Sequence, residues 1–340
     1  MIPYQPPRPL KEIPLIDFSP AYSANPRERA KLAAALRDAC VNVGFFYLGN
    51  HGVSDAMLAG QLEWAQRVFS LPPEQLEAVS VAHSKAYMGY AGIGAQALDS
   101  DTPPDLKESF YVGVDMQADH PYVKAGLPNC GPNQWPDLPD FREHTEAYFA
   151  VMGELSRHVM RMLALSLEVD EHWFDPITAK PNNNILRMLR YPPHPSAAKA
   201  NQLGAGAHTD FAGVTLLLQD DSGGLEVRNC AGEWLRASPV PGTLVVNLGD
   251  MMPRWTNDIY ISNMHRVLNN VSGRTRHSVA HFFNPDYYTR VECLPSCHSP
   301  ERPVKYPPCT AGEHIAHMYE LTYGRARAAR AESDAALRLP

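Results

Sequence analysis

The chain has 340 residues, of which 44% are hydrophobic and 20% charged, and its formal net charge is −7 at pH 7. This balance is ordinary for a globular protein, and the length allows two domains or one large mixed domain. We expect a single compact unit over residues 1–340. The acidic charge argues against nucleic acid or an anionic membrane surface as a partner, which leaves a small molecule. The sequence leaves the oligomeric state open.

Targeting and cysteine patterns indicate a cytoplasmic protein. The chain has no run of about 18 apolar residues, and its N-terminus lacks the basic and apolar regions of a signal peptide. Its six cysteines are too few for a disulfide scaffold and suit a reducing compartment. Cys293, Cys297, His298 and Cys309 are candidates for a zinc site, but the paired Cys-x2-Cys spacing is missing.

The first region, residues 11–135, is expected to alternate short strands with helices. Residues 13–17 and 45–48 have the apolar and aromatic character of strands. Asn25, which precedes a proline, predicts the start of one helix, and Ser54 predicts the start of another.

In the rest of the chain, the composition and the spacing of apolar residues change several times. Residues 83–136 are rich in glycine and proline and predict irregular backbone over one face of the core. Apolar residues at helical spacing predict one long amphipathic helix over residues 141–169. Residues 180–285 carry short apolar runs separated by turn signals, which is typical of a sandwich or barrel. Residues 286–340 form a C-terminal extension, in which we expect a surface helix from residue 310 onward.

Three residues of the strand-rich region have the chemistry of a metal site. His208 and Asp210 are two positions apart, so on a strand their side chains point to the same face. His265 follows beyond several predicted strands and suits a ligand delivered from another strand of the same barrel. Two imidazoles and one carboxylate that leave other positions open form the arrangement of non-haem Fe(II) oxygenases. We therefore predict these three as metal ligands and as the catalytic centre.

Arg276 and Ser278 share one face of the last predicted strand. A guanidinium grips a carboxylate with two parallel hydrogen bonds, and a hydroxyl adds another donor. The pair therefore predicts a site for the remote carboxylate of a diacid; the alternative is a surface salt bridge of Arg276. If the pair faces the pocket, His277 and His281 point away, which leaves His265 as the third ligand.

These motifs occur together with others in an order that resembles a known family. His208-Thr209-Asp210 and Arg276-His277-Ser278 are two of them, and the matches extend from about residue 11 to about residue 310. The chain is similar to the isopenicillin-N-synthase-like branch of the Fe(II)/2-oxoglutarate-dependent dioxygenases. The matching segments are residues 13–17, 44–48, 50–52, 190–193, 208–210, 216–220, 224–227, 241–250, 265–267 and 276–278.

The resemblance implies a mixed α+β fold, in which a double-stranded β-helix (jelly roll) core over residues 180–285 is flanked by helices. It also implies an oxidoreductase that carries Fe(II) on His208, Asp210 and His265. Such an enzyme oxidises a small organic substrate, with hydroxylation as the default outcome. Oxidation is coupled to O2 consumption and to decarboxylation of 2-oxoglutarate to succinate and CO2.

The cosubstrate positions match the family with one departure. The resemblance implies that Arg276 and Ser278 bind the far carboxylate of 2-oxoglutarate, with Tyr191 as an additional donor. Plant members usually have asparagine two residues before that tyrosine, whereas this chain has Leu189. The role of that asparagine therefore has no counterpart at position 189.

The substrate pocket is predicted from fewer signals. Arg187 lies on the same parity as Leu189 and Tyr191, which makes it a candidate anchor for an acidic group; an exterior arginine is the alternative. The other candidate lining residues are Phe211, Met252, Phe283 and the segment 85–115. Together they suit a small organic acid or an amino-acid-like substrate.

Two other functions fit the same residues. An Fe(II) oxidase of this fold that works without 2-oxoglutarate would use Arg276 and Ser278 to hold its substrate's own carboxylate. A non-catalytic jelly roll that binds a small molecule would need a fourth protein ligand to close the metal site, and the sequence suggests none.

Overall fold

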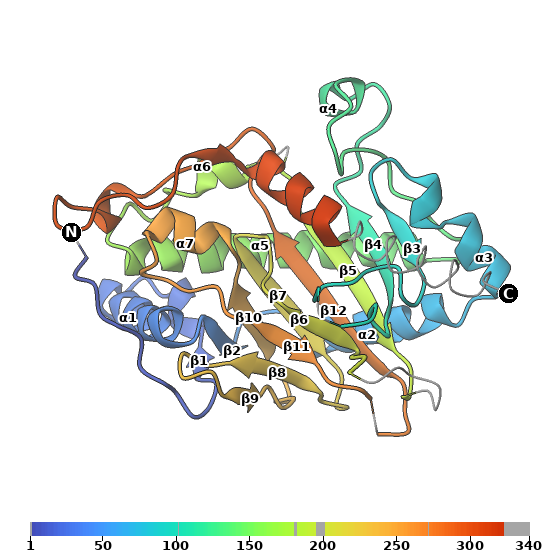
Figure 1. Cartoon of the computed structure of the whole chain (residues 1–340), viewed down its shortest axis with the longest axis horizontal. Helices are drawn as coiled ribbons and strands as arrows, with labels where there is room; N and C mark the ends of the chain where they lie inside the picture. The colour runs from blue at the N-terminus through green and yellow to red at the C-terminus, as the bar shows by residue number, and fades with distance from the viewer. Residues whose placement is uncertain (1, 101, 180–181, 195–200, 271, 323–340) are drawn as a thin grey trace, which may run out of the picture.

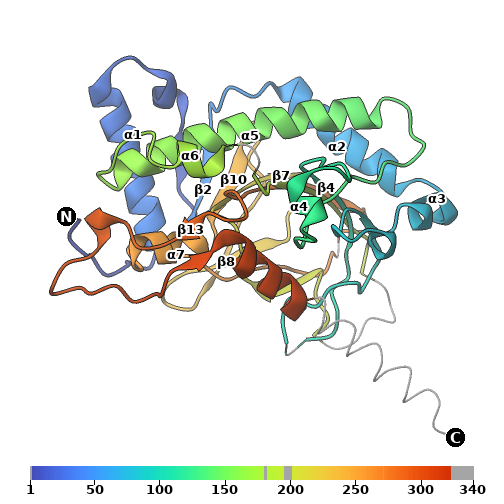
Figure 2. The ribbon, with the colours of Figure 1, turned by 90° about the horizontal axis from the view of Figure 1, so that it is seen from above.

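The computed structural model describes residues 2–100, 102–179, 182–194, 201–270 and 272–322. A large sheet and a small sheet face each other, and the long helices lie on the outer side of the large sheet (Figures 1 and 2). Among the described residues, none of the helices has the length and hydrophobicity needed to span a bilayer.

The large sheet has β12 near its centre, between β5 and β7, and both of these pairings are antiparallel. Its one parallel pairing among the described strands is that of β1 with β2. In spatial order, the strands are β1 (Leu15–Asp17), β2 (Phe45–Gly49), β10 (Leu244–Leu248), β7 (Val214–Gln219), β12 (Arg276–Phe283), β5 (Ile185–Tyr191), β4 (Glu108–Gly113) and β3 (Gly89–Ala91).

The small sheet covers the inner side of the large one. Its order is β6 (Ala205–His208), β11 (His265–Val267), β8 (Leu225–Arg228) and β9 (Trp234–Arg236). A separate pair, β13 (Arg290–Val291) with β14 (Cys309–Thr310), lies in the C-terminal extension.

Three long helices form the outer layer: α1 (Pro26–Asn42), α2 (Asp55–Phe69) and α5 (Phe141–Ser166). Both predicted caps are confirmed, because Asn25 accepts a hydrogen bond from the Arg27 N–H at 3.0 Å and Ser54 accepts one from the Met57 N–H at 3.3 Å. Shorter helices are α3 (Pro73–Ala78), α4 (Pro121–Lys124), α6 (Asp175–Thr178), α7 (Met251–Thr256) and the 3-10 turns Ser19–Tyr22, Val81–His83 and Pro295–Cys297.

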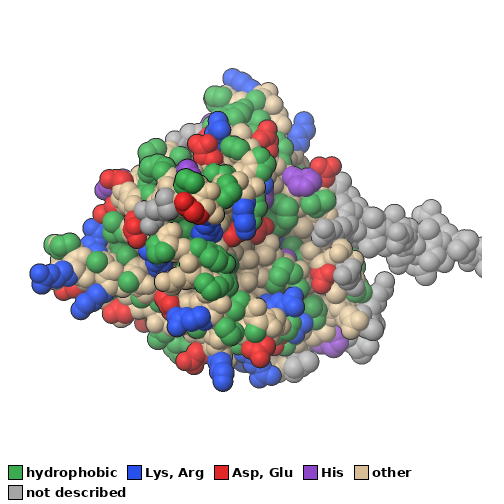
Figure 3. Space-filling view, turned by 60° about the vertical axis from the view of Figure 1, so that its left-hand side comes forward, with side chains coloured by type: hydrophobic (Ala, Val, Ile, Leu, Met, Phe, Trp, Pro, Cys, Tyr) green, Lys and Arg blue, Asp and Glu red, His purple; other side chains and the backbone are tan. Residues whose placement is uncertain are grey.

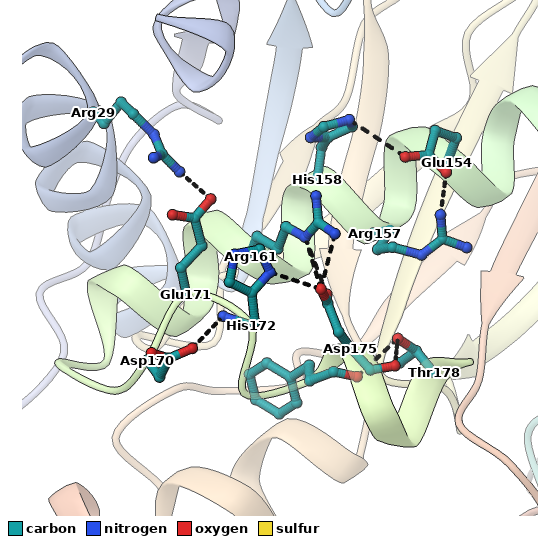
Figure 4. A network of polar contacts seen from close by, with 11 residues as sticks. Arg29, Glu154, Arg157, His158, Arg161, Asp170, Glu171, His172, Asp175 and Thr178 are labelled. Carbon is teal, nitrogen blue, oxygen red and sulfur yellow. Dashed lines mark hydrogen bonds and ion pairs between the residues drawn. The ribbon is translucent and has the colours of Figure 1, made fainter. Parts of the chain in front are cut away.

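Polar contacts fix the C-terminal end of α5 (Figure 4). The Arg161 guanidinium holds the Asp175 carboxylate with bonds of 3.0 and 2.8 Å, which joins α5 to α6. Arg29 of α1 forms an ion pair with Glu171 in the segment between those helices. Arg161 and Arg29 are each paired with a carboxylate, so the positive charges of this network are balanced within the protein.

The two larger of the three clusters of buried side chains form most of the core. The larger lies between the outer helices and the large sheet, where Tyr148 and Met152 of α5 are in one cluster with Leu216 and Val279. The smaller cluster lies between the two sheets and includes Phe45, Leu189, Val227 and Val245. On the face seen in Figure 3, basic and acidic side chains are interspersed and form no large patch of one sign.

Two expectations about the backbone are wrong. Residues 83–136 are not wholly irregular, because β3 and β4 lie within them and β4 pairs with β5 along its length. The apolar run in β4 is short, and its partner lies more than 70 residues away, so its strand character comes from long-range pairing. Residues 311–322 are helical as expected, but Ala311 and Ile315 are buried, so the helix packs on the body of the protein. Arg325, Arg327, Arg330 and Arg338 lie outside the described residues.

Candidate metal centre

His208, Asp210 and His265 meet between the two sheets. His265 on β11 is directly opposite His208 on β6 in the antiparallel register, and the two imidazole centroids are 4.2 Å apart. The Asp210 Oδ1 atom lies 3.8 Å from Nε2 of His208 and 3.6 Å from Nε2 of His265. Strand pairing therefore brings together two side chains that are far apart in the sequence.

Backbone carbonyls orient both imidazoles. Nδ1 of His208 lies 2.7 Å from the carbonyl oxygen of Gly206, and Nδ1 of His265 lies 3.4 Å from that of Asn263. A proton on each Nδ1 donates to its carbonyl, which leaves the Nε2 lone pair directed at the shared point. Burial, followed by the charge of His265, lowers the pKa of His208 well below its usual range, so the imidazole stays neutral and able to bind a metal.

The carboxylate of Asp210 is fixed through its other oxygen. Oδ2 accepts hydrogen bonds from the Thr215 hydroxyl at 2.6 Å and from the Asn247 side-chain amide at 2.7 Å. Oδ1 is thereby left to face the two imidazoles. Such partners behind a ligand hold its orientation, and their loss typically weakens metal binding about 10- to 100-fold.

The three donor atoms fit a divalent transition metal. They lie within 4.8 Å of one another, and in the described part of the chain this is the only cluster of His, Cys, Asp and Glu with that property. Ligand atoms about 2.0–2.2 Å from an ion, at right angles to each other, are about 3 Å apart, so a small inward shift of these side chains completes the contacts. Three protein ligands leave further positions on the metal open.

A cavity extends from these residues to Arg276, and Lys107, Arg187 and Tyr191 also line it. The Arg276 guanidinium is buried, lies 4.7 Å from the centre of the Tyr191 ring, and donates to Ser278 Oγ at 3.3 Å and to Gln219 Oε1 at 3.4 Å. Within the described residues its Nε has no partner and no carboxylate pairs with it. A buried cation without an anion is costly, so this end of the cavity suits an anionic ligand.

A second cavity shares Arg187, His208 and Asp210 with the first and is also lined by Phe211. The Arg187 guanidinium donates to Ser109 Oγ at 3.0 and 2.8 Å and to Gln96 Oε1 at 2.9 Å. It also lies 4.7 Å from the centre of the Tyr111 ring. Arg187 is therefore held in the interior of the protein, and the alternative of an exterior arginine is wrong.

The structure places Phe283 elsewhere. Arg276, Ser278 and Phe282 line the cavities, whereas Phe283 is buried in the cluster between the large sheet and the helices. Alternation along β12 gives the physical reason, because position 283 has the opposite parity to position 276. Phe282 takes the place in the pocket that we expected for Phe283.

The structure agrees with the expectation that residues 85–115 line the pocket, because Lys107 and Gln96 line the cavities and Ser109 bonds to Arg187. Met252 is instead buried in the cluster between the large sheet and the helices. Sequence reasoning missed Ile315 and Tyr319, which line the second cavity and come from the helix expected to lie on the surface. The alternation of residues 107, 109 and 111 would have placed them on one face, had residues 108–113 been recognised as a strand.

The chain belongs to the 2OG-Fe(II) oxygenase superfamily, which matches residues 182–285. Residues 13–138 match the N-terminal region described as that of the non-haem dioxygenase in morphine synthesis. The protein is therefore an oxidoreductase that uses Fe(II), 2-oxoglutarate and O2, and the predictions of family, cofactor and jelly-roll fold are confirmed.

Similar proteins come from fungi and plants. The 2-oxoglutarate-Fe(II) type oxidoreductase hxnY of Emericella nidulans is 42% identical over 328 residues, which cover 94% of this chain and 93% of that protein. Homoarginine-6-hydroxylase 2-ODD-233 of Oryza sativa subsp. japonica is 35% identical, and the match covers 90% of this chain and 95% of that protein. A full-length Neurospora crassa protein crystallised with alpha-KG and thymine is 30% identical, with a TM-score of 0.80 and coverage of 91% of this chain and 97% of that one.

Proposed function

We propose that His208, Asp210 and His265 hold the Fe(II) of this dioxygenase. The observation that carries the proposal is the convergence of two Nε2 atoms and one carboxylate oxygen, each fixed from behind by another group. Bound there, the metal supplies the activation of O2 that is coupled to decarboxylation of 2-oxoglutarate. The protein side chains supply the geometry, and burial keeps the His208 imidazole neutral.

Arg276, Ser278 and Tyr191 bind the far carboxylate of 2-oxoglutarate in this proposal. The guanidinium is buried without a carboxylate partner among the described residues, and the Ser278 hydroxyl lies beside it. The diacid would thus span the first cavity, with its keto acid end at the metal and its other end at Arg276. This places the cosubstrate on one side of the metal and leaves the second cavity for substrate.

The substrate is a small organic acid or an amino-acid-like molecule, and hydroxylation is its default oxidation. Arg187 is the proposed anchor for its acidic group, and Phe211 and Phe282 line the apolar walls beside the metal ligands. A relative named for homoarginine hydroxylation and a neighbour crystallised with thymine support a small polar substrate. All six cysteines are free, which supports the reducing cytoplasm as the compartment.

The test begins with the unaltered enzyme under anaerobic conditions. Addition of 2-oxoglutarate to the Fe(II)-loaded protein is expected to give a weak visible charge-transfer band. An enzyme that forms no such band and releases no succinate is instead the 2-oxoglutarate-independent oxidase.

Substrate class is then tested with a panel of small carboxylic acids, each assayed for succinate release beside its primary amide. Arg187→Met is expected to raise KM for an accepted acid roughly 10- to 100-fold, because a hydrogen-bonded charge pair is lost, and to leave the amide nearly unchanged. Arg274→Met is the matched control, since Arg274 pairs with Asp221 on the surface. Equal losses for acid and amide would contradict the assignment of Arg187.

A further inference from the structure

Lys107 is a buried cation that the site described above does not use. Only 3% of its surface is exposed. Its ammonium group forms an ion pair with Asp105, and both side chains are 2% exposed. Burying a lysine is costly even when it is paired, so its place beside the active site calls for an explanation.

The strand register puts Lys107 on the inner face of the large sheet. Glu108 is opposite Arg190, and these two side chains form an ion pair at 2.9 Å away from the cavity. Lys107 directly precedes β4 and has the opposite parity to Glu108, so it points the other way. It lines the cavity that contains Arg276, and it does not line the cavity that contains Phe211.

Asp105 fixes the ammonium group near the metal end of that cavity. Its Oδ1 accepts a hydrogen bond from the Gly206 N–H at 2.9 Å, and Gly206 is two residues before His208 on β6. Its Oδ2 pairs with the lysine. The ammonium is thus held against the strand that carries a metal ligand, and the charge of Lys107 acts on both His208 and Arg187.

The ammonium group still has donors to offer. It carries three N–H groups, and Asp105 is its one acceptor among the described residues. Leu189, which lines the same cavity, presents no polar atom. Arg187 also lines this cavity, but its guanidinium already donates to Ser109 and Gln96, whereas Lys107 keeps N–H groups for a ligand oxygen.

We propose that Lys107 binds the metal-proximal carboxylate of 2-oxoglutarate, the one adjacent to the keto group. The inference rests on the proposed function, which places the cosubstrate in the first cavity. Arg276 and Lys107 then serve opposite ends of one dianion. Each end of the diacid meets its own cation, which favours a 2-oxo diacid over other anions of the same size.

The competing explanation is that Lys107 only neutralises Asp105 and so keeps Gly206 in place. In that case Lys107→Met and Asp105→Asn would act alike, by disturbing β6 and weakening Fe(II) binding. A direct contact instead weakens the binding of the 2-oxo acid to protein that is already loaded with metal.

The experiment uses two ligands that differ at one end. Both 2-oxoglutarate and 2-oxobutyrate carry the keto group and its adjacent carboxylate, but 2-oxobutyrate lacks the far carboxylate. Each is titrated anaerobically into the Fe(II)-loaded enzyme and followed by the visible charge-transfer band. Fe(II) affinity and the midpoint of thermal unfolding are measured separately for the unaltered protein, Lys107→Met, Lys107→Gln, Lys107→Arg, Asp105→Asn and Arg276→Met.

Lys107→Met is expected to weaken both acids by the same factor, roughly 10- to 100-fold, because the lost contact is to the end they share. Arg276→Met is expected to weaken 2-oxoglutarate alone, and Lys107→Arg to recover part of the loss. Fe(II) affinity should stay within about threefold in Lys107→Met, a difference below 1 kcal/mol. If Lys107→Met does not fold, Lys107→Gln takes its place with the same expectation, because its amide can still bond Asp105.

Three results would overturn the proposal. One is a Lys107→Met variant with unchanged affinity for both acids. Another is a Lys107→Met variant that loses affinity for 2-oxoglutarate alone. The third is a fall in Fe(II) affinity and unfolding temperature that matches Asp105→Asn. Failure of the proposed function itself would appear earlier and differently, because the unaltered enzyme would then show no band with 2-oxoglutarate.

Discussion

The two faces of β12 differ in how their polar groups find partners. On the inner face, Arg276 and Ser278 line a cavity, and the guanidinium meets no carboxylate among the described residues. On the outer face, Val279 and Phe283 pack in the apolar cluster formed with the helices, and His281 bonds to Ser156 of α5. One strand thus supplies both a structural layer and a binding surface. The inner face presents a buried cation to a cavity, whereas the outer face packs against the helices.

The buried histidines show the same contrast between the outer and the inner face. His281 is fully buried, and its Nδ1 lies 3.1 Å from Ser156 Oγ, with no carboxylate recorded beside it. His208 and His265 also have a partner at Nδ1, but their Nε2 atoms converge with Asp210. Burial of a histidine therefore does not define a metal site. The convergence of lone pairs from separate strands does.

The largest expected effect comes from removing the carboxylate of Asp210, which lies between the two sheets. Asp210→Ala takes away one of three metal ligands, so Fe(II) affinity and succinate release should each fall by more than about 100-fold, beyond the usual effect of losing a group behind a ligand. Fe(II) titration and a coupled O2-uptake assay measure the two quantities. The variant should still fold, because the site lies between sheets whose packing it does not form.

Asp175→Ala is the matched control for that experiment. Asp175 also accepts bonds from two side chains, Arg161 and His172, but it lies in the helical layer (Figure 4). Its loss is expected to cost at most about 1 kcal/mol of stability, because the pair is partly exposed, and to leave Fe(II) binding unchanged. Normal metal binding by Asp210→Ala would refute the assignment of the inner site.

The next largest expected effect is a contrast between alanine substitutions at the adjacent residues Phe282 and Phe283. Phe283 is 1% exposed in the outer cluster, so Phe283→Ala should lower the free energy of unfolding by about 3–5 kcal/mol. Phe282 lines both cavities, so Phe282→Ala should mainly raise the substrate KM. Urea unfolding and steady-state kinetics on both variants measure the contrast. A larger loss of stability at position 282 than at 283 would reverse the assignment of the faces.

Strand alternation explains what the sequence could predict and what it could not. It correctly separated Arg276 and Ser278 from His277 and His281, because parity is a local property of one strand. The same rule, applied one step further, would have rejected Phe283. His208 and Asp210 were recognisable from their spacing, although β6 ends at His208 and Asp210 lies two residues beyond it.

Residues that depend on long-range pairing were not predictable in this way. Ser109 reaches Arg187 because β4 pairs with β5, and Tyr319 lines the second cavity because the helix at residues 311–322 packs on the body. Glycine and proline around residues 83–136 instead indicated a loop, and tertiary pairing overrode that local preference.

The smallest effect concerns the outer histidine and pH. Burial alone lowers the pKa of His281 from 6.5 to about 3, so the folded protein keeps it neutral while the unfolded chain binds a proton. Its contribution to stability is complete above pH 6.5 and is lost progressively as the pH falls toward 3. At pH 5 that loss amounts to about 2 kcal/mol.

His281→Asn should remove this part of the acid sensitivity while lowering stability at pH 7. Urea unfolding at pH 7, 6 and 5 is expected to show a shallower fall in the free energy of unfolding for the variant than for the unaltered protein. Fe(II) affinity at pH 7 should not change, since His281 faces the helices and not the cavity. If the free energy of unfolding falls equally steeply with pH in both proteins, the folded state already protonates His281. If His281→Asn loses Fe(II) binding, the two faces of β12 do not have separate roles.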